Sequence, residues 1–200
     1  MKMNTREKIL AVGAEIILQK GFNHTGIQEL LNSARIPKGS FYFYFDSKEN
    51  FGLELVDYYY RWISENIEAY VKDKGKTPLD RLRLMFEWSF KMLAKNDFKG
   101  GCLIGNLSLE MADINEKFRI KLDQTIRDIR KQIADQLKKA KEEGEIGDHH
   151  DVDALSDFLF SSWEGTLMLM KVAKSTSPEK IFFDMIFGKI LRQPEPSSVR

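Results

Sequence analysis

Residues 25–48 read T-G-I-Q-E-L-L-N-S-A-R-I-P-K-G-S-F-Y-F-Y-F-D-S-K, and this stretch decides the fold. Thr25 and Gln28 have the spacing of a capping box before apolar residues at helical spacing, so we expect a helix to begin there. A turn would begin at Arg35. Pro37 suits the first position of a second helix, because proline lacks the N–H that has no partner there. The sequence therefore predicts two short helices joined by a tight turn.

Five consecutive aromatic residues, 41–45, belong to the second of these helices. Helical spacing places Phe41 and Phe45 on one face, and a small core needs only these two rings. The other three rings then face outward, where tyrosine hydroxyls can donate to phosphates and a phenylalanine can lie against a thymine methyl group. The alternative is that all five rings pack in the core.

The stretch 37–50, P-K-G-S-F-Y-F-Y-F-D-S-K-E-N, resembles the signature of the TetR/AcrR family of bacterial transcriptional repressors, and the close match covers about residues 6–56. Leu31 and Arg35 stand where that family usually has Ala and Gly, so Arg35 must adopt a turn conformation that costs it roughly 1 kcal/mol. The resemblance implies a helix-turn-helix whose second helix meets base edges in the major groove. The residues that it implies to face DNA bases or phosphates are Gln28, Lys38, Gly39, Ser40, Tyr42, Phe43, Tyr44 and Lys48.

The composition is that of an ordinary globular protein, with 42% hydrophobic residues in 200 and a formal net charge of +1. The charge is uneven: residues 1–48 hold seven Lys or Arg and four Asp or Glu, whereas the rest holds 24 and 26. A basic head on a slightly acidic body suits one nucleic-acid-binding face.

The single cysteine, Cys102, fits a reducing compartment. Without a secretory signal or a run of about 18 apolar residues, we expect a cytoplasmic protein that spans no membrane.

Helical periodicity continues through the rest of the chain, which shows no strand pattern and no internal repeat. We therefore expect an all-α protein with a helix-turn-helix domain at 1–48, a helical ligand-binding and dimerisation domain at 49–192, and a disordered tail at 193–200. Outside the motif, the expected helices are 5–20, 48–71, 77–95, 103–112, 115–143, 152–174 and 177–192. The residues expected to cap helices are Thr5, Asp46 with Ser47, and Asp151, and Thr77-Pro78 is expected to begin the helix at 77–95.

A small-molecule site is expected among the helices of the C-terminal domain, as in other helical bundles. The stretch G-C-L-I-G-N-L-S-L-E at 101–110 resembles a subset of the same family whose members respond to small reactive or carboxylate compounds. Asn106 and Glu110 form a polar pair one turn apart between apolar residues, which favours a ligand role; core packing is the alternative for the others. The predicted lining residues are Trp88, Met92, Phe98, Cys102, Asn106, Glu110, Trp163 and Met168.

Two further patterns have competing interpretations. Cys102 follows two glycines and precedes a helix N-terminus, which lowers a thiol pKa, so it is either an accessible sensing thiol or a small buried residue. The run D-H-H-D at 148–151 offers metal-binding side chains, but adjacent residues rarely converge on one ion. We expect a solvated loop there, with Asp151 capping the next helix. No metal, cofactor or catalytic set is expected, so the chain is not predicted to be an enzyme.

The last two expected helices, 152–174 and 177–192, carry more large apolar residues than one face can bury. Pairing with their symmetry mates would bury the rest in a homodimer. The sequence thus predicts a one-component repressor whose dimer binds a palindromic double-stranded operator and is released by a small-molecule effector. The alternative is a repressor triggered by oxidation or electrophilic attack at Cys102. A helical enzyme is a third alternative, which no catalytic constellation supports.

Overall fold

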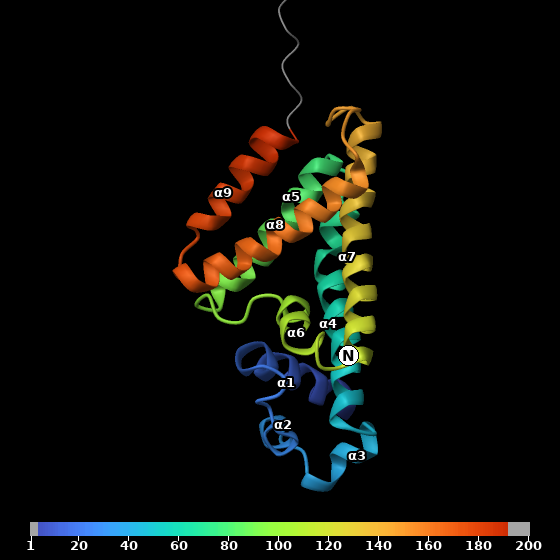
Figure 1. The fold of residues 1–200 in the computed structure, drawn as a ribbon, viewed down its shortest axis with the longest axis vertical. Coiled ribbons are helices and arrows are strands. Elements are labelled where there is room, and N and C mark those ends of the chain that lie inside the picture. Colours follow the sequence, from blue (N-terminus) through green and yellow to red (C-terminus); the bar gives the residue numbers. More distant parts are fainter. Residues whose placement is uncertain (1–3, 192–200) are drawn as a thin grey trace, which may run out of the picture. The chain divides into compact units, whose positions relative to one another are not determined.

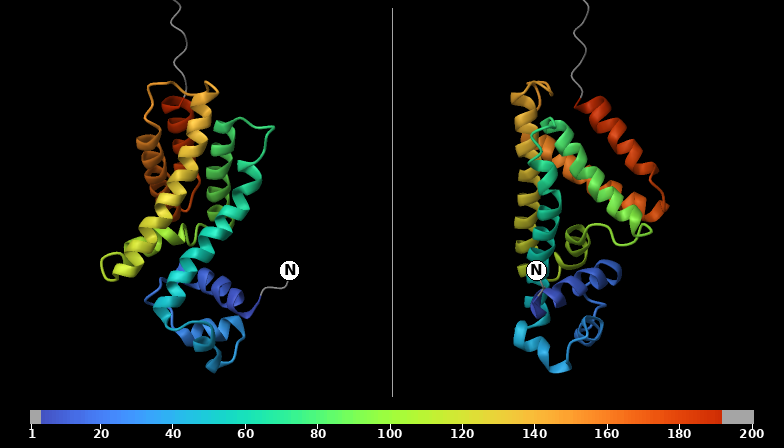
Figure 2. Two further views of the ribbon diagram at one scale, coloured as in Figure 1. Left: turned by 90° about the vertical axis from the view of Figure 1, so that its right-hand side faces the viewer. Right: turned by 180° about the vertical axis from the view of Figure 1, so that it is seen from behind.

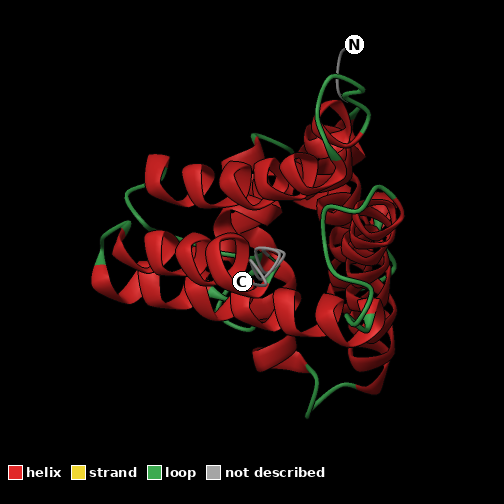
Figure 3. Cartoon of the chain, turned by 90° about the horizontal axis from the view of Figure 1, so that it is seen from above, coloured by secondary structure: helices red, strands yellow, loops and turns green. Residues whose placement is uncertain are grey.

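The computed structural model describes residues 4–191, and within that range it contains helices and loops but no strand (Figure 3). The all-α prediction is therefore confirmed. In chain order, the helices are α1 (Thr5–Lys20), α2 (Ile27–Ala34), the 3₁₀ turn η1 (Lys38–Ser40), α3 (Phe41–Tyr44), α4 (Lys48–Val71), α5 (Pro78–Lys95), α6 (Leu103–Met111), α7 (Glu116–Glu142), α8 (Val152–Ala173), α9 (Ser177–Met185) and the π-helical turn η2 (Ile186–Ile190) (Figure 1). The tail predicted at 193–200 lies outside the described residues. None of the helices within 4–191 has both the length and the apolar character needed to cross a membrane.

The chain divides into two compact units, and the boundaries between them fall inside α4 and α7. One unit contains the described residues up to Asn66 together with Gly100–Arg127. The other contains Ile67–Lys99 and the described residues from Asp128 onward. The three N-terminal helices therefore share a compact unit with α6 and the first turns of α7. The domain boundary expected at residue 48 stays a prediction.

Aromatic rings form the core of the first unit, where the N-terminal helices gather around the start of α4 (Figure 2). Phe41 and Phe45 contact Phe51 of α4, with ring centroids 5.7 and 5.1 Å apart. All three rings are fully buried. A Cβ atom at Gly13 of α1 would come within 2.5 Å of the Phe51 ring, so glycine is needed for this close approach. This cluster fixes α1 and α3 on α4.

Outside the helix-turn-helix, one predicted helix cap differs from the structure. Asp151 caps α8 as predicted, and Thr77 caps α5 at the predicted start of that helix. At α1 the cap is Asn4 and not Thr5: Asn4 Oδ1 accepts from Glu7 N at 2.9 Å, and Glu7 Oε2 accepts from Asn4 N at 3.1 Å. This capping box forms at Asn4 because Glu7 stands three residues after it, whereas a lysine stands three residues after Thr5.

The second unit surrounds another aromatic cluster, contributed by α5, α8 and α9. Phe182 of α9 lies edge-on to Phe86 and Phe90 of α5, with ring centroids 5.1 and 5.3 Å apart. Trp163 of α8 is buried, and its Nε1 donates to Ser89 Oγ of α5 at 2.7 Å. Helix α9 lies beside α8 (Figure 1) and passes into the π-helical turn η2, whereas the sequence predicted one continuous α-helix.

Candidate DNA-binding interface

The tight turn predicted between two short helices joins α2 to η1. The chain reverses at Arg35, whose backbone is left-handed with φ 55° and ψ 50°. Ile36 N donates to Leu31 O at 2.9 Å and Arg35 N donates to Asn32 O at 3.0 Å, so carbonyls at the end of α2 find donors. Pro37 precedes η1 as its N-cap instead of being its first residue. Arg35 thus adopts the conformation expected of it, at a cost of roughly 1–2 kcal/mol for a residue other than glycine.

The capping box predicted from Thr25 and Gln28 does not form. Thr25 Oγ1 donates instead to Gly21 O at 2.7 Å, and α2 begins later, at Ile27. The physical reason is that the carbonyl of Gly21, the C-cap residue of α1, has no partner within the helix, and the buried threonine hydroxyl satisfies it. Gln28 Nε2 donates to Asn32 Oδ1 at 2.7 Å, and Gln28 stays exposed on α2.

The aromatic run divides between core and surface, as the helical spacing predicts. Phe41 and Phe45 are 0% and 1% exposed, whereas Tyr42 and Phe43 are 67% and 82% exposed. The Tyr44 ring is half-buried and lies edge-on to Phe43, with centroids 5.0 Å apart. The alternative that all five rings belong to the core is therefore wrong. Two large apolar rings remain on the surface of α3.

The turn η1 and helix α3 together, residues 38–44, are called the recognition segment below. Lys38, Gly39 and Ser40 form its first turn and lead directly into the aromatic run. Gly39 is exposed, and a Cβ atom added there would meet nothing within 4 Å. Its bare backbone is therefore open to a close approach by another molecule.

Lys48, predicted to contact a phosphate, is partly buried at the start of α4. Its Nζ lies 4.7 Å from the centroid of the Phe22 ring. Burial lowers the pKa of Lys48, while the negative charge of Glu110 acts in the opposite direction. Ser47 caps the same helix, since Ser47 Oγ accepts from Asn50 N at 3.0 Å. The ammonium group is thus positioned by Phe22, and its contact with DNA stays a prediction.

Glu110 of α6, predicted to line the ligand site, holds the loop between α1 and α2. Phe22 N donates to Glu110 Oε2 at 2.8 Å, and Asn23 N donates to Glu110 Oε1 at 2.7 Å. Asn23 Nδ2 also lies 3.5 Å from Met111 Sδ. Hydrogen bonds to a carboxylate are stronger than those between neutral groups. Both carboxylate oxygens of Glu110 therefore hold the loop that leads into the helix-turn-helix. The sequence did not reveal this role, because it shows Glu110 only as a single charge on an apolar helix. A ligand role for Glu110 stays a prediction.

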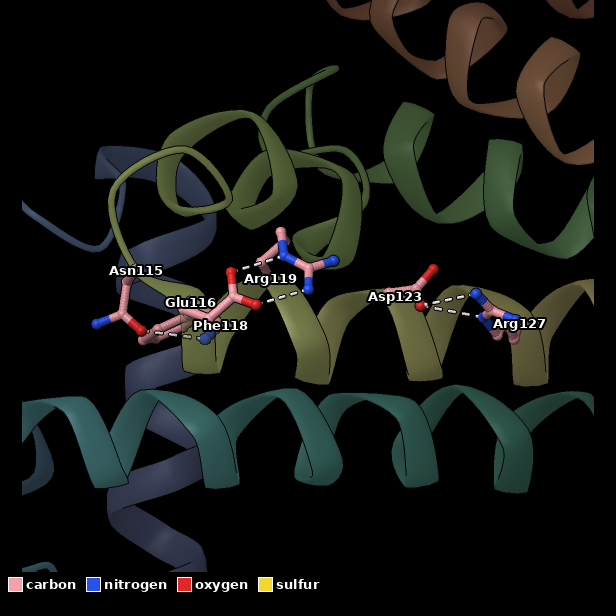
Figure 4. A network of polar contacts seen from close by, with 6 residues as sticks. All are labelled: Asn115, Glu116, Phe118, Arg119, Asp123 and Arg127. Carbon is pink, nitrogen blue, oxygen red and sulfur yellow. Dashed lines mark hydrogen bonds and ion pairs between the residues drawn. The ribbon is translucent and has the colours of Figure 1, made fainter.

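The first turn of α7 is tied to α4 in the same unit. Asn115 Oδ1 accepts from Phe118 N at 3.1 Å, which caps α7 (Figure 4). Asn115 Nδ2 also donates to Glu49 Oε2 of α4 at 2.7 Å. Lys117 also pairs with Glu49, and hydrogen bonds from Lys117 and Asn115 lower the pKa of that carboxyl. Figure 4 also shows the ion pairs Glu116–Arg119 and Asp123–Arg127 further along α7.

Gly52 is the point where the α1–α2 loop, α4 and α7 meet. The rings of Phe22 and Phe118 lie edge-on, with centroids 5.1 Å apart. A Cβ atom at Gly52 would lie 2.5 Å from Phe22 Cε2 and closer still to the Phe118 ring. The two rings therefore pack directly on the backbone of α4. No sequence pattern pointed to this contact, because its three residues come from separate helices or loops.

Cys102 immediately precedes α6, and Asn106 lies in its first half, one turn before Glu110. Cys102 is only 4% exposed, which agrees with the small buried residue and not with the accessible thiol, the two alternatives that the sequence left open. Gly100, two residues before it, serves close packing: a Cβ atom there would lie 2.8 Å from Leu18 of α1. Asn106 Nδ2 donates to Gly100 O at 3.2 Å. The two side chains thus support the entry to α6, and their ligand roles stay predictions.

The other predicted ligand residues belong to the second unit, and they are Trp88, Met92, Phe98, Trp163 and Met168. Trp163 is buried against Ser89, and Trp88 and Phe98 are half-buried. Met92 and Met168 are both exposed, so these two side chains point away from the core of their unit. The burial of Trp163 fits a pocket-lining role better than the exposure of Met92 and Met168 does. All of these ligand roles stay predictions.

The histidine pair in the loop before α8 does not assemble a metal site. The rings of His149 and His150 lie 4.1 Å apart, and Asp151 accepts hydrogen bonds from the first turn of α8. Burial, then the neighbouring His149 and Lys141, lowers the pKa of His150. Among residues 4–191, no three His, Cys, Asp or Glu side chains are grouped so that they could hold a metal ion.

The exposed recognition segment on a three-helix head defines a helix-turn-helix DNA-binding protein. Residues 9–55 match the family described as bacterial regulatory proteins, tetR family. Residues 78–186 match the family described as the tetracyclin repressor-like C-terminal domain. The chain therefore belongs to the TetR family of DNA-binding transcriptional regulators, which are not enzymes. The family resemblance seen in the sequence is thus confirmed.

Individual relatives agree with this assignment. The chain is 33% identical to the transcriptional regulator AcuR of Cereibacter sphaeroides over 172 residues, 86% of this chain and 78% of AcuR. A crystal structure of regulatory protein TetR from Rhodobacter sphaeroides has a TM-score of 0.85 and 33% identity, and the match covers 91% of this chain and 96% of that one. The repressor NemR of Escherichia coli is 29% identical over 175 residues, 88% of each chain. The crystal structure of reduced NemR has a TM-score of 0.83 and 27% identity, covering 96% of this chain and 99% of NemR.

Proposed function

We propose that this regulator is a repressor that binds a palindromic operator as a homodimer and leaves it when a small molecule binds its C-terminal helices. The observation that carries the proposal is the surface of the recognition segment, where Tyr42 and Phe43 are exposed beside the open backbone of Gly39. Residues at this place in a helix-turn-helix meet base edges in the major groove. Because its target is operator DNA, we propose a cytoplasmic location.

The proposed contacts follow from the chemistry of the exposed groups. Phe43 would lie against a thymine methyl group, and Tyr42 and Tyr44 would donate to phosphates. Lys48 would supply a further phosphate contact from the start of α4. The residues proposed to meet base edges are Gln28, Lys38, Gly39 and Ser40.

Homodimerisation is proposed from the outward face of α8 and α9. The side chains of Phe158, Leu169, Val172, Ile181 and Met185 are between 44% and 78% exposed. Symmetric pairing of the two helices with their mates would bury these side chains. The recognition segments of the two subunits, about 34–36 Å apart, would then bind the two halves of a palindrome.

Two large aromatic residues of the C-terminal helical segments, Phe160 and Phe187, do not belong to this exposed set. Phe160 and Phe187 are half-buried within the chain, where Phe160 contacts Trp163 and Phe187 contacts Phe183, each with ring centroids 5.7 Å apart. The dimer face is therefore better represented by Val172 on α8.

Release by an effector is proposed to act through α6. Glu110 of α6 accepts hydrogen bonds from the backbone of Phe22 and Asn23, which lead into the helix-turn-helix. A ligand-induced movement of α6 would pull on this loop and change the tilt of α2 and the recognition segment. The match of residues 78–186 to a C-terminal domain of the tetracyclin repressor type supports an effector-binding role.

Selection of duplexes from a random pool by the purified chain tests the operator. We expect an enriched palindrome with half-site centres about 10 base pairs apart. Screening small molecules against that duplex should then yield compounds that release the wild-type protein. Enrichment of no sequence above background, or of single half-sites only, would contradict the proposal.

A thiol trigger at Cys102 is a second candidate, because a relative, NemR, has a crystal structure specified as its reduced form. The cysteine also stands at the N-cap position of α6. Its burial means that an electrophile reaches the sulfur only after local opening. Under this alternative, Cys102→Ser would bind operator but resist release by electrophiles, whereas under the main proposal its release by a non-reactive ligand is unchanged.

A further inference from the structure

Arg35 combines a positive charge with a backbone conformation that favours glycine. Its φ of 55° and ψ of 50° put it in the left-handed region at the end of α2. At the end of α1 the C-cap residue is Gly21, which also has a positive φ, with φ 86° and ψ 161°. A strained residue persists where the surrounding structure or the function compensates for the strain. The presence of arginine at this turn therefore calls for a compensating role.

Nothing in the described chain uses the charge of Arg35. The side chain is exposed and makes no hydrogen bond or ion pair within residues 4–191. Three other cations of the first unit have partners within the chain: Arg6 pairs with Glu54, Lys20 pairs with Glu29, and Lys48 lies over Phe22. A guanidinium at a helix C-terminus interacts favourably with the helix dipole, but for an exposed group that effect is small and screened by salt. Packing and intramolecular electrostatics therefore do not account for Arg35.

We infer that Arg35 binds a DNA phosphate beside the recognition segment. It precedes Lys38, the first residue of that segment, by three positions, so the two backbones lie within about 11 Å of each other. The planar guanidinium can donate two parallel hydrogen bonds to one phosphate. A glycine at the turn could make no such contact. The inference rests on the proposed docking of the recognition segment in the major groove, and adds a contact made by the turn itself.

The test measures binding to a fluorescein-labelled duplex of about 30 base pairs and arbitrary sequence at several salt concentrations, because a phosphate contact acts on every sequence. Arg35→Gly and Arg35→Asn remove the charge with residues that tolerate the left-handed conformation. Both should reduce the slope of log affinity against log salt by about 0.9 per bound head, and weaken binding roughly eightfold per head near 0.1 M salt. Arg35→Lys should keep the slope of the wild type.

Two controls separate charge from folding. Lys139→Ala removes an exposed cation at the far end of α7, in the second unit, and should change neither slope nor affinity. The melting temperature of Arg35→Gly should equal or exceed that of the wild type, because glycine relieves the strain at the turn. If that variant folds poorly, the salt slopes of Arg35→Asn and Arg35→Lys are compared instead.

Wild-type slopes in both Arg35→Gly and Arg35→Asn would overturn the inference. So would an Arg35→Lys variant that loses as much slope as Arg35→Gly, because the charge would then not be responsible. A wild-type protein that binds no duplex would instead remove the proposed docking on which the inference rests. The failure of this one contact is thus distinguishable from the failure of the proposed function.

Discussion

Two identical side chains, Phe41 and Phe43, have opposite environments in this protein. The first is buried against Phe45 and Phe51, and the second is the most exposed ring of the recognition segment. At the scale of the residue, position on the helix decides whether an aromatic ring stabilises the fold or is offered to a partner.

Alanine substitution should separate these two roles. Phe41→Ala removes a fully buried ring and should lower the free energy of unfolding by about 3–5 kcal/mol. Phe43→Ala should change stability by about 0.5 kcal/mol or less, because exposed side chains contribute little to folding. It should nevertheless alter sequence preference in duplex binding. Chemical denaturation and a duplex selection measure the two effects, and equal stability losses in both variants would contradict this division.

The stability that Glu110 gives to the α1–α2 loop should be reduced even by an isosteric substitution. Glu110→Gln replaces one carboxylate oxygen with an amide donor that faces a backbone N–H, so one loop hydrogen bond is lost, at about 1–3 kcal/mol. The amides of Phe22 and Asn23 should then exchange faster with solvent. Glu142→Gln, at the exposed end of α7, is the matched control and should change neither quantity. Unchanged exchange at Phe22 and Asn23 in Glu110→Gln would show that the carboxylate does not hold the loop.

At the scale of the element, α6 and the start of α7 belong physically with the DNA-binding helices. Glu110 holds the α1–α2 loop, Asn115 binds Glu49 of α4, and Phe118 packs on Phe22. Each contact joins elements that are far apart in the chain. A change in α6 therefore has a short physical path to the loop that precedes α2.

Two glycines of the first unit should respond differently to a methyl group. Gly52→Ala forces a Cβ atom into the Phe22 and Phe118 rings and should destabilise the protein by about 1–3 kcal/mol. Gly39→Ala adds a Cβ atom in open space and should leave the melting temperature nearly unchanged. If DNA approaches the backbone at Gly39, the second variant should bind duplex more weakly. Thermal melts and duplex titrations give both readouts, and a stable Gly52→Ala protein would contradict the packing described here.

At the scale of the whole molecule, α8 and α9 expose several large apolar side chains that pairing with a second copy would bury. We expect that Val172→Asp and Ile181→Asp each produce monomers, because an unpaired carboxylate would be buried at the interface. These monomers should keep their helical content and lose tight operator binding.

Leu109→Asp is the control for this dimer prediction, because Leu109 is an exposed apolar residue on α6. That variant should sediment like the wild type. Sedimentation velocity at micromolar concentration distinguishes the species. A monomeric wild type that still binds operator tightly would rule out the proposed assembly.

The amino-acid sequence by itself determined the parts of this protein that depend on neighbouring residues. The helices, the position of the turn at Arg35 and the split between Phe41 and Phe43 follow from periodicity and turn chemistry, which act over a few positions. The left-handed conformation of Arg35 was expected from the family resemblance. Neighbouring residues can also compete for the same local role: Asn4, and not Thr5, caps α1. The tertiary structure alone decided the partners of Glu110, 87 and 88 residues away, and the burial of Cys102. No periodicity encodes such contacts, because they form only when separate helices pack and each buried or charged group binds whatever partner the packing brings near it.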